Sequence, residues 1–289
     1  MDTLRVYENR DAVAETQSVR RGEYDGLVQT GMGRADELVY LMAALKFFEH
    51  LDQVEVAEER AGIPNDLQKR CLAIMPVLGI PTIANIPERL FKDAGLLRFL
   101  GCNAQQIANG FTQRGPKKKK QQPKRLPFHE DDLRNSLKTI APAQSQQFFT
   151  GCIGELFRTK SVRGGIYAID GTELLVGDAK TFEGTGTITV PVRHKDGSVT
   201  YETKTGYKLI YLLNLKPDRE VVVSYRLVPL NTNALQVVRE MVEETLQVGG
   251  EGAIELLLMD REFVDGELIN WLKGDHGIDV IIPVKKNMD

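Results

Sequence analysis

Cysteine is scarce in this sequence. The chain of 289 residues has three cysteines, Cys71, Cys102 and Cys152, which lie far apart and form no C-x-x-C pair. This number and spacing exclude a disulfide framework and make a structural zinc site implausible. We expect free thiols buried in a reducing compartment.

Long apolar runs are also missing. The most apolar early stretch, residues 71–80, is interrupted by Pro76 and is too short to span a bilayer. Residues 1–10 carry acidic side chains and no apolar centre, so they do not form a signal peptide. We therefore expect a cytoplasmic protein with no membrane partner.

Several motifs of common enzymes are absent. The sequence contains no G-x-x-x-x-G-K-[ST], no H-E-x-x-H and no G-x-S-x-G, and its four histidines are scattered. These absences exclude a phosphate-binding loop of that type, a zinc protease helix and a nucleophile elbow. Among the kinds of catalytic site considered, metal-assisted chemistry on carboxylates is the one that the sequence still allows.

The overall composition is that of a soluble globular protein, with 42% hydrophobic and 27% charged residues. The length allows two domains. The net charge of −3 neither indicates nor excludes nucleic-acid binding, because contact depends on local patches of charge.

In the first half of the chain, apolar residues recur at the spacing that is typical of α-helices. Residues 1–35 are polar and glycine-rich, and we expect a flexible N-terminal arm. Residues 36–160 should form a helical DNA-binding domain that begins with an amphipathic helix near Asp36. Two short helices meet at residues 101–103, with Asn103 as N-cap. They resemble a helix-turn-helix, although an ordinary helical hairpin explains the same pattern.

A basic linker at residues 116–125 interrupts this half of the chain. Six lysine and arginine side chains lie there among proline and glutamine, and the segment will not fold alone because like charges repel and there is nothing to bury. It is a solvated linker, and it could also contact DNA phosphates through six side chains: Lys117, Lys118, Lys119, Lys120, Lys124 and Arg125.

From residue 161 the pattern changes to that of an α/β domain. Ile166–Ile169 is a short apolar strand, and Asp196-Gly197 between alternating runs predicts a hairpin. Two further strands follow at 207–215 and 221–228. A helix, the strand 253–259, a second helix and a strand at 279–284 complete the order.

Two of these strands end in an aspartate. Asp170 follows Ile166–Ile169, and Asp260 follows the apolar run 253–259. Each could be an ordinary turn residue whose side chain bonds its own backbone. Sites of open α/β sheets gather at the carboxyl ends of strands, however, and carboxylates are ligands for divalent metal ions.

The segments Ala168–Thr172 (A-I-D-G-T) and Met259–Phe263 (M-D-R-E-F) resemble the two acidic motifs of insertion-sequence DDE transposases. The resemblance covers roughly residues 164–289. It implies a ribonuclease H-like mixed sheet with flanking helices at 161–289, after an all-α N-terminal domain. It also implies that Asp170 and Asp260 are catalytic and bind Mg²⁺ or Mn²⁺.

The resemblance further implies partners and a location. Double-stranded DNA, as transposon ends and target, would be the partner, a homodimer on DNA is possible, and the protein would be nucleoid-associated. Arg261, Lys285 and Lys286 lie near strand ends, where they could contact the DNA backbone or be ordinary surface charges.

The sequence departs from the family in one respect. The third acid of the family is a glutamate on a later helix, and no such helix occurs before Asp289. We therefore expect a C-terminally incomplete catalytic domain that cuts DNA poorly by itself. A ribonuclease H-like nuclease and a non-catalytic DNA-binding remnant are the alternatives.

Overall fold

The computed structural model describes residues 41–56, 63–111, 127–177, 182–216 and 219–283, together with Gln17, Arg21 and Leu38. The chain divides into two compact units, Met1–Phe148 and Phe149–Asp289. Within the described ranges, no helix combines the length and the apolar character needed to cross a membrane.

The first unit is helical where it is described. Its elements are α3 (Phe47–Asp52), α4 (Asn65–Ile74), η2 (Ile83–Asn85), α5 (Ile86–Arg89), α6 (Ala94–Phe99), α7 (Ala104–Asn109) and α8 (Glu130–Thr139). Fully buried side chains from α4, α6 and α8, such as Ile74, Leu97 and Leu133, form one apolar cluster. Cys71 and Cys102 are buried free thiols, as expected, and Cys152 is half-buried.

Capping decides several boundaries in this unit. Asn103 begins α7 with a reciprocal capping box to Gln106, which confirms the predicted cap. The amphipathic helix predicted near Asp36 is interrupted within the described residues. Lys46 adopts a left-handed conformation (φ 54°) that starts α3 anew, and Leu41 is 51% exposed.

Helix α9 (Pro142–Arg158) continues into the second unit, which begins at Phe149. The strands of this unit are β1 (Gly165–Leu175), β2 (Gly186–Arg193), β3 (Val199–Lys216), β4 (Arg219–Pro229), β5 (Ile254–Met259) and β6 (Asp279–Ile281). The helices α10 (Ala234–Gly249) and α11 (Gly266–His276) alternate with the last strands.

The strand order of the second unit is ribonuclease H-like. In the main sheet the order is β4-β3-β1-β5-β6, with antiparallel pairing from β4 to β1 and parallel pairing from β1 to β6. Three consecutive antiparallel strands are thus followed by two parallel strands, each reached through a helix. The predicted mixed sheet with flanking helices is confirmed.

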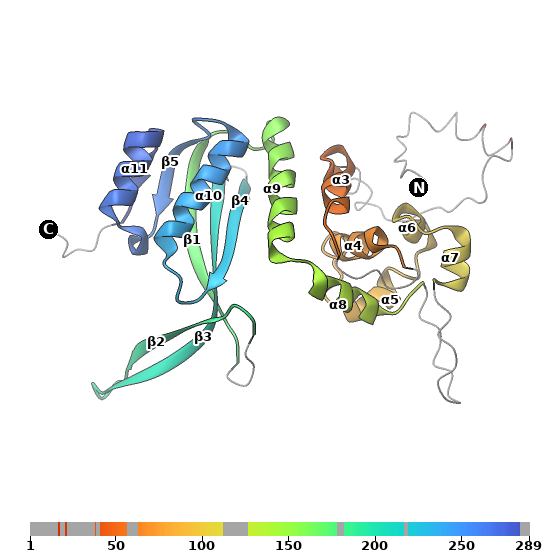
Figure 1. The fold of residues 1–289 in the computed structure, drawn as a ribbon, viewed down its shortest axis with the longest axis horizontal. Coiled ribbons are helices and arrows are strands. Elements are labelled where there is room, and N and C mark those ends of the chain that lie inside the picture. Colours follow the sequence, from red (N-terminus) through yellow and green to blue (C-terminus); the bar gives the residue numbers. More distant parts are fainter. Residues whose placement is uncertain are drawn as a thin grey trace. The chain divides into compact units, whose positions relative to one another are not determined.

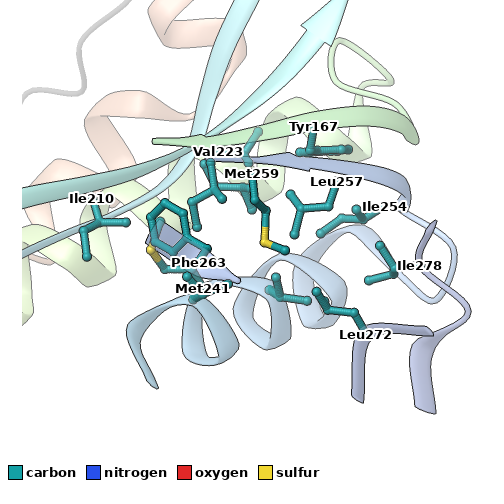
Figure 2. Packing of buried hydrophobic residues seen from close by; sticks show 14 of the residues in the cluster. Tyr167, Ile210, Val223, Met241, Ile254, Leu257, Met259, Phe263, Leu272 and Ile278 are labelled. Carbon is teal, nitrogen blue, oxygen red and sulfur yellow. The ribbon is translucent and has the colours of Figure 1, made fainter. Parts of the chain in front are cut away.

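One face of this sheet carries the core. Tyr167 and Ile169 on β1 and Leu257 and Met259 on β5 point to the same side and are at most 3% exposed. They pack against apolar side chains of α10 and α11, among them Met241 and Leu272 (Figure 2). The core therefore fixes which strand residues point inward and which point to the opposite face.

The hairpin of β2 and the first half of β3 extends away from the main sheet (Figure 1). Its turn contains Gly197 at φ 86°, as the Asp-Gly signal predicted. Gly186 and Gly206 are cross-strand partners at its base. A Cβ at Gly206 would lie 2.2 Å from the carbonyl oxygen of Leu174 on β1, so only glycine fits where β3 changes partner from β2 to β4.

Candidate active site

The two aspartates lie on neighbouring parallel strands, Asp170 within β1, which was expected to end there but continues to Leu175, and Asp260 directly after β5. Ile169 on β1 pairs in register with Met259 on β5, and the next residue on each strand is an aspartate, Asp170 and Asp260. Adjacent strands lie about 4.8 Å apart, so the two carboxylates are neighbours at the carboxyl edge of the sheet. Both side chains are exposed.

Strand alternation places both carboxylates on one face. Ile169 and Met259 point into the core, and successive side chains on a strand point to opposite faces. Asp260 keeps an extended backbone (φ −74°, ψ 162°), so the alternation continues through it. Asp170 and Asp260 therefore share the face opposite to α10 and α11.

Hydrogen bonds hold each carboxylate. Asp170 Oδ1 accepts from the amide of Gly171 at 2.8 Å, and its Oδ2 accepts from the hydroxyl of Tyr211 at 3.1 Å. Asp260 Oδ1 accepts from the amide of Arg261 at 2.6 Å and caps a short 3-10 turn, η3 (Arg261–Phe263). The local bonds to Gly171 and Arg261 are those of a turn aspartate, whereas the bond from Tyr211 comes from another strand.

Tyr211 is a hydrogen-bond donor at neutral pH. Desolvation, followed by its hydrogen bond to the negatively charged Asp170, raises the pKa of the Tyr211 phenol above its ordinary value. The phenol therefore remains protonated beside the carboxylate.

A second charged pair lies near the same edge but on the core-side face. Lys208 Nζ is 2.8 Å from Glu262 Oε2, and the lysine stem passes over Gly171, where a Cβ would lie 2.9 Å from Lys208 Cε. Lys208 stands directly opposite Glu173 on β1, yet it reaches Glu262 instead. Glu262 is therefore engaged with Lys208 and does not point at the two aspartates as a third acid would.

The donor set suits a hard cation. Mg²⁺ is commonly bound through one or two carboxylates, with water and substrate phosphates completing its ligands. Two adjacent exposed carboxylates match that requirement. Within the described ranges, no three histidine, cysteine, aspartate or glutamate side chains gather as they would around a metal ion.

Of the remaining predicted site residues, one lies within the described ranges. Arg261 directly follows Asp260 and is exposed. The basic linker side chains Lys117, Lys118, Lys119, Lys120, Lys124 and Arg125 lie outside the described residues, as do Lys285 and Lys286.

Sequence reasoning missed Tyr211 and Lys208. Both lie on β3, some 40 residues from the first acid, and only the β1–β3 register places them near the site. No local motif marks either residue. A prediction would have required the cross-strand pairing, which depends on the length of the intervening hairpin.

The strand order and the paired aspartates define a ribonuclease H-like domain with an acidic pair at its carboxyl edge. Residues 163–289 match the family model of the transposase DDE domain. Residues 163–289 are thus similar to a transposase DDE domain, and the resemblance inferred from the two acidic motifs is confirmed. No curated protein matches the sequence.

Two solved transposase structures are similar to the chain. One is a piggyBac transposase synaptic complex with hairpin DNA, at 13% identity and a TM-score of 0.39, with 86% of this chain covered. The chain spans about half, 51%, of that piggyBac chain. The other is a Mos1 transposase paired-end complex with the left transposon end, at 13% identity and a TM-score of 0.25, covering 92% of this chain and 71% of that chain.

Proposed function

We propose that this protein is a DNA transposase that carries out metal-dependent DNA strand cleavage and transfer at insertion-sequence ends. One observation carries the proposal. In a transposase DDE domain, Asp170 and Asp260 follow paired positions of two adjacent parallel strands and point to one face.

Asp170 and Asp260 are the proposed catalytic and metal-binding residues. Bound there, Mg²⁺ or Mn²⁺ would activate water or a DNA 3′-hydroxyl and stabilise the leaving oxygen. The carboxylates would hold the ions, and the rigid β1–β5 pairing would fix their separation. Exposure of both side chains leaves room for a DNA phosphate to approach.

A third acid must come from elsewhere than the described candidates. Glu262 is paired with Lys208, and Glu267 lies in the first turn of α11, where an acid interacts favourably with the helix dipole. Asp289 lies outside the described residues. We therefore propose that residues 1–289 hold two of three catalytic acids and cut DNA poorly by themselves.

Double-stranded DNA is the proposed partner. Residues 36–160 would supply the DNA-binding domain, with the basic linker at 116–125 along the phosphates. Arg261, Lys285 and Lys286 would contact the backbone near the cut. A homodimer on DNA and a location at the nucleoid complete the proposal.

The metal site is tested without relying on full activity. Fe²⁺ replaces Mg²⁺, and ascorbate with peroxide generates radicals that cut the polypeptide near the bound ion. We expect fragments ending near residues 170 and 260 from the parent chain. The Asp170→Asn, Asp260→Asn double variant should give none, because the carboxylate ligands are gone. Equal fragmentation of both proteins at these positions would refute the site.

Strand cleavage is tested on supercoiled plasmid with Mg²⁺ or Mn²⁺. We expect nicking near background from the parent, because two carboxylates leave the metal pair one ligand short. Robust nicking that disappears in the double variant would support the aspartate site and contradict the missing third acid. Robust nicking that survives in the double variant would place the chemistry outside this site.

A further inference from the structure

A row of side chains crosses three strands next to the first acid. Asp170 on β1 is directly opposite Tyr211 on β3, and Tyr211 is directly opposite Tyr225 on β4. Opposite residues of an antiparallel pair point to the same face, so all three share the face of the acidic pair.

An irregularity in β4 creates this row. Leu213 pairs with Val222, but Leu212 pairs with Ser224, so Val223 is an extra residue without an opposite partner. Val223 and Ser224 both turn into the core, at 4% and 0% exposure. Without the bulge Ser224 would stand opposite Tyr211, so the bulge is what brings Tyr225 there.

The far end of the row is packed against a helix. The Phe149 ring of α9 meets the Tyr225 ring edge to face, with centroids 4.9 Å apart at 83°. Tyr225 therefore has a fixed neighbour on one side and Tyr211 beside it on the other.

We propose that Tyr211 is a positioning residue that orients the Asp170 carboxylate for metal binding. The proposal rests on the proposed function, since it assigns a role toward the metal held by Asp170 and Asp260. Tyr211 contacts neither the metal nor the DNA in this role, and it acts through the carboxylate.

The geometry explains how the single hydroxyl group of Tyr211 can orient the Asp170 carboxylate. A carboxylate on a single Cβ can rotate, and a backbone amide bond to Oδ1 alone fixes only one oxygen. The hydroxyl of Tyr211 on Oδ2 adds a second anchor and sets the plane of the group. Each oxygen accepts one hydrogen bond here and keeps a lone pair for a cation.

Loss of such an outer hydrogen bond usually weakens metal affinity about 10–100-fold. We expect Tyr211→Phe to raise the Kd for Mn²⁺ by about tenfold or more while the melting temperature stays near that of the parent. In metal-dependent DNA cleavage by a complete enzyme, the same variant should raise the metal concentration for half-maximal rate more than it lowers the maximal rate.

The matched control is Tyr207→Phe. Tyr207 lies four residues earlier on β3, on the same face, and its hydroxyl donates to the backbone carbonyl of Glu183 instead of to an acid. The Tyr207→Phe substitution removes a phenolic oxygen from β3, as Tyr211→Phe does. Its Kd for Mn²⁺ should stay within about twofold of the parent, since no bond to a metal-binding carboxylate is lost.

The experiment is a Mn²⁺ titration of the 289-residue chain followed by electron paramagnetic resonance, for the parent, both tyrosine variants and Asp170→Asn, Asp260→Asn. Weak binding by Tyr211→Phe alone among the tyrosine variants supports the proposal. Binding by Tyr211→Phe as tight as by the parent overturns it and leaves the metal site standing. If the parent binds no better than the double aspartate variant, the metal site fails and the role of Tyr211 fails with it.

Discussion

At the scale of single residues, Glu244 on α10 gathers more partners than either candidate acid. Its carboxylate accepts hydrogen bonds from Thr150 at 2.6 Å, Ser224 at 2.7 Å and Arg226 at 2.9 Å. Desolvation alone would raise the pKa of Glu244, but these three bonds outweigh it and hold the pKa below its ordinary value. The group joins α9, β4 and α10, so its role is in the fold of the second unit.

The lowered pKa of Glu244 gives a pH-dependent stability. The contribution is complete above the ordinary glutamate pKa of about 4.3 and is lost as the pH falls through the lower value in the folded state. We expect Glu244→Gln to reduce the free energy of unfolding by about 1–3 kcal/mol at pH 7, with a smaller difference near pH 3. Urea unfolding followed by the fluorescence of Trp271, the single tryptophan, measures both values.

Glu240→Gln is the control for this prediction. Glu240 lies one turn earlier on α10, is 53% exposed at its side chain, and is 3.9 Å from Arg226. Exposed pairs of this kind contribute little, so the control should change stability by less than about 1 kcal/mol. Equal effects of the two variants would contradict a special role for Glu244.

At the scale of elements, the sheet has one covered and one partly open face. Ile169 on the covered face is 3% exposed, whereas Ile166 on the other face of the same strand is 45% exposed. Val222 and Ile281 on that second face are also more than a third exposed. The sidedness of β1 is therefore a direct consequence of where α10 and α11 lie.

A pair of substitutions tests this sidedness. Ile169→Ala should lower the free energy of unfolding by about 2–5 kcal/mol, because it removes buried methyl groups and leaves a cavity. Ile166→Ala should cost about 1 kcal/mol or less, since the side chain is already hydrated. Urea unfolding at pH 7 compares the two, and a larger loss for Ile166→Ala would mean that the two faces are assigned wrongly.

Local signals allowed many element boundaries to be predicted. Asn233 and Asp265 cap α10 and α11, and such caps can be found from sequence because a cap depends on residues two or three positions away. Where several cap or stop residues lie close together, a local signal does not identify the boundary. His129 rather than Asp131 or Asp132 caps α8, and Gly274 lies inside α11, which continues to His276.

The candidate site was only partly predictable, for a related reason. Asp170 and Asp260 each follow a short apolar run, so a local pattern found them, although β1 continues past Asp170 to Leu175. Tyr211 and the bulge at Val223 depend on which residue stands opposite which across three strands. That register is set by the base of the β2–β3 hairpin and by core packing, and neither can be read from spacing along the chain.

At the scale of the whole molecule, the family match covers only the second part of the chain, residues 163–289. The helical first unit and the basic linker at 116–125 must therefore be assigned by experiment. Six positive side chains in ten residues are the strongest local charge in a chain whose net charge is −3. Their contribution to DNA binding can be separated from that of the catalytic domain by its salt dependence.

We expect Lys117, Lys118, Lys119, Lys120, Lys124 and Arg125 to add sequence-independent DNA affinity. Each neutralised phosphate contributes about 0.9 to the slope of log affinity against log salt. Replacing all six with glutamine should flatten the slope by several units on unrelated duplexes, as measured by fluorescence anisotropy. Replacing the five lysines with arginine keeps the charge and should keep the slope. An unchanged slope in the glutamine variant would leave the segment as a linker only.

The paired glycines at the base of the β2–β3 hairpin mark a boundary between two regions. On one side the sequence is constrained by close backbone packing, and on the other side the length of the hairpin can vary. On the sheet side of Gly186 and Gly206, the backbones of β1 and of Leu230 and Asn231, directly after β4, approach so closely that no side chain can be added. Beyond them, among the described strands, β2 and β3 pair only with each other. The length of the ribbon is therefore uncoupled from the core. Insertion or deletion of matched residue pairs would change its reach by about 3.4 Å per residue along each strand, while Asp170, Tyr211 and Asp260 keep their places.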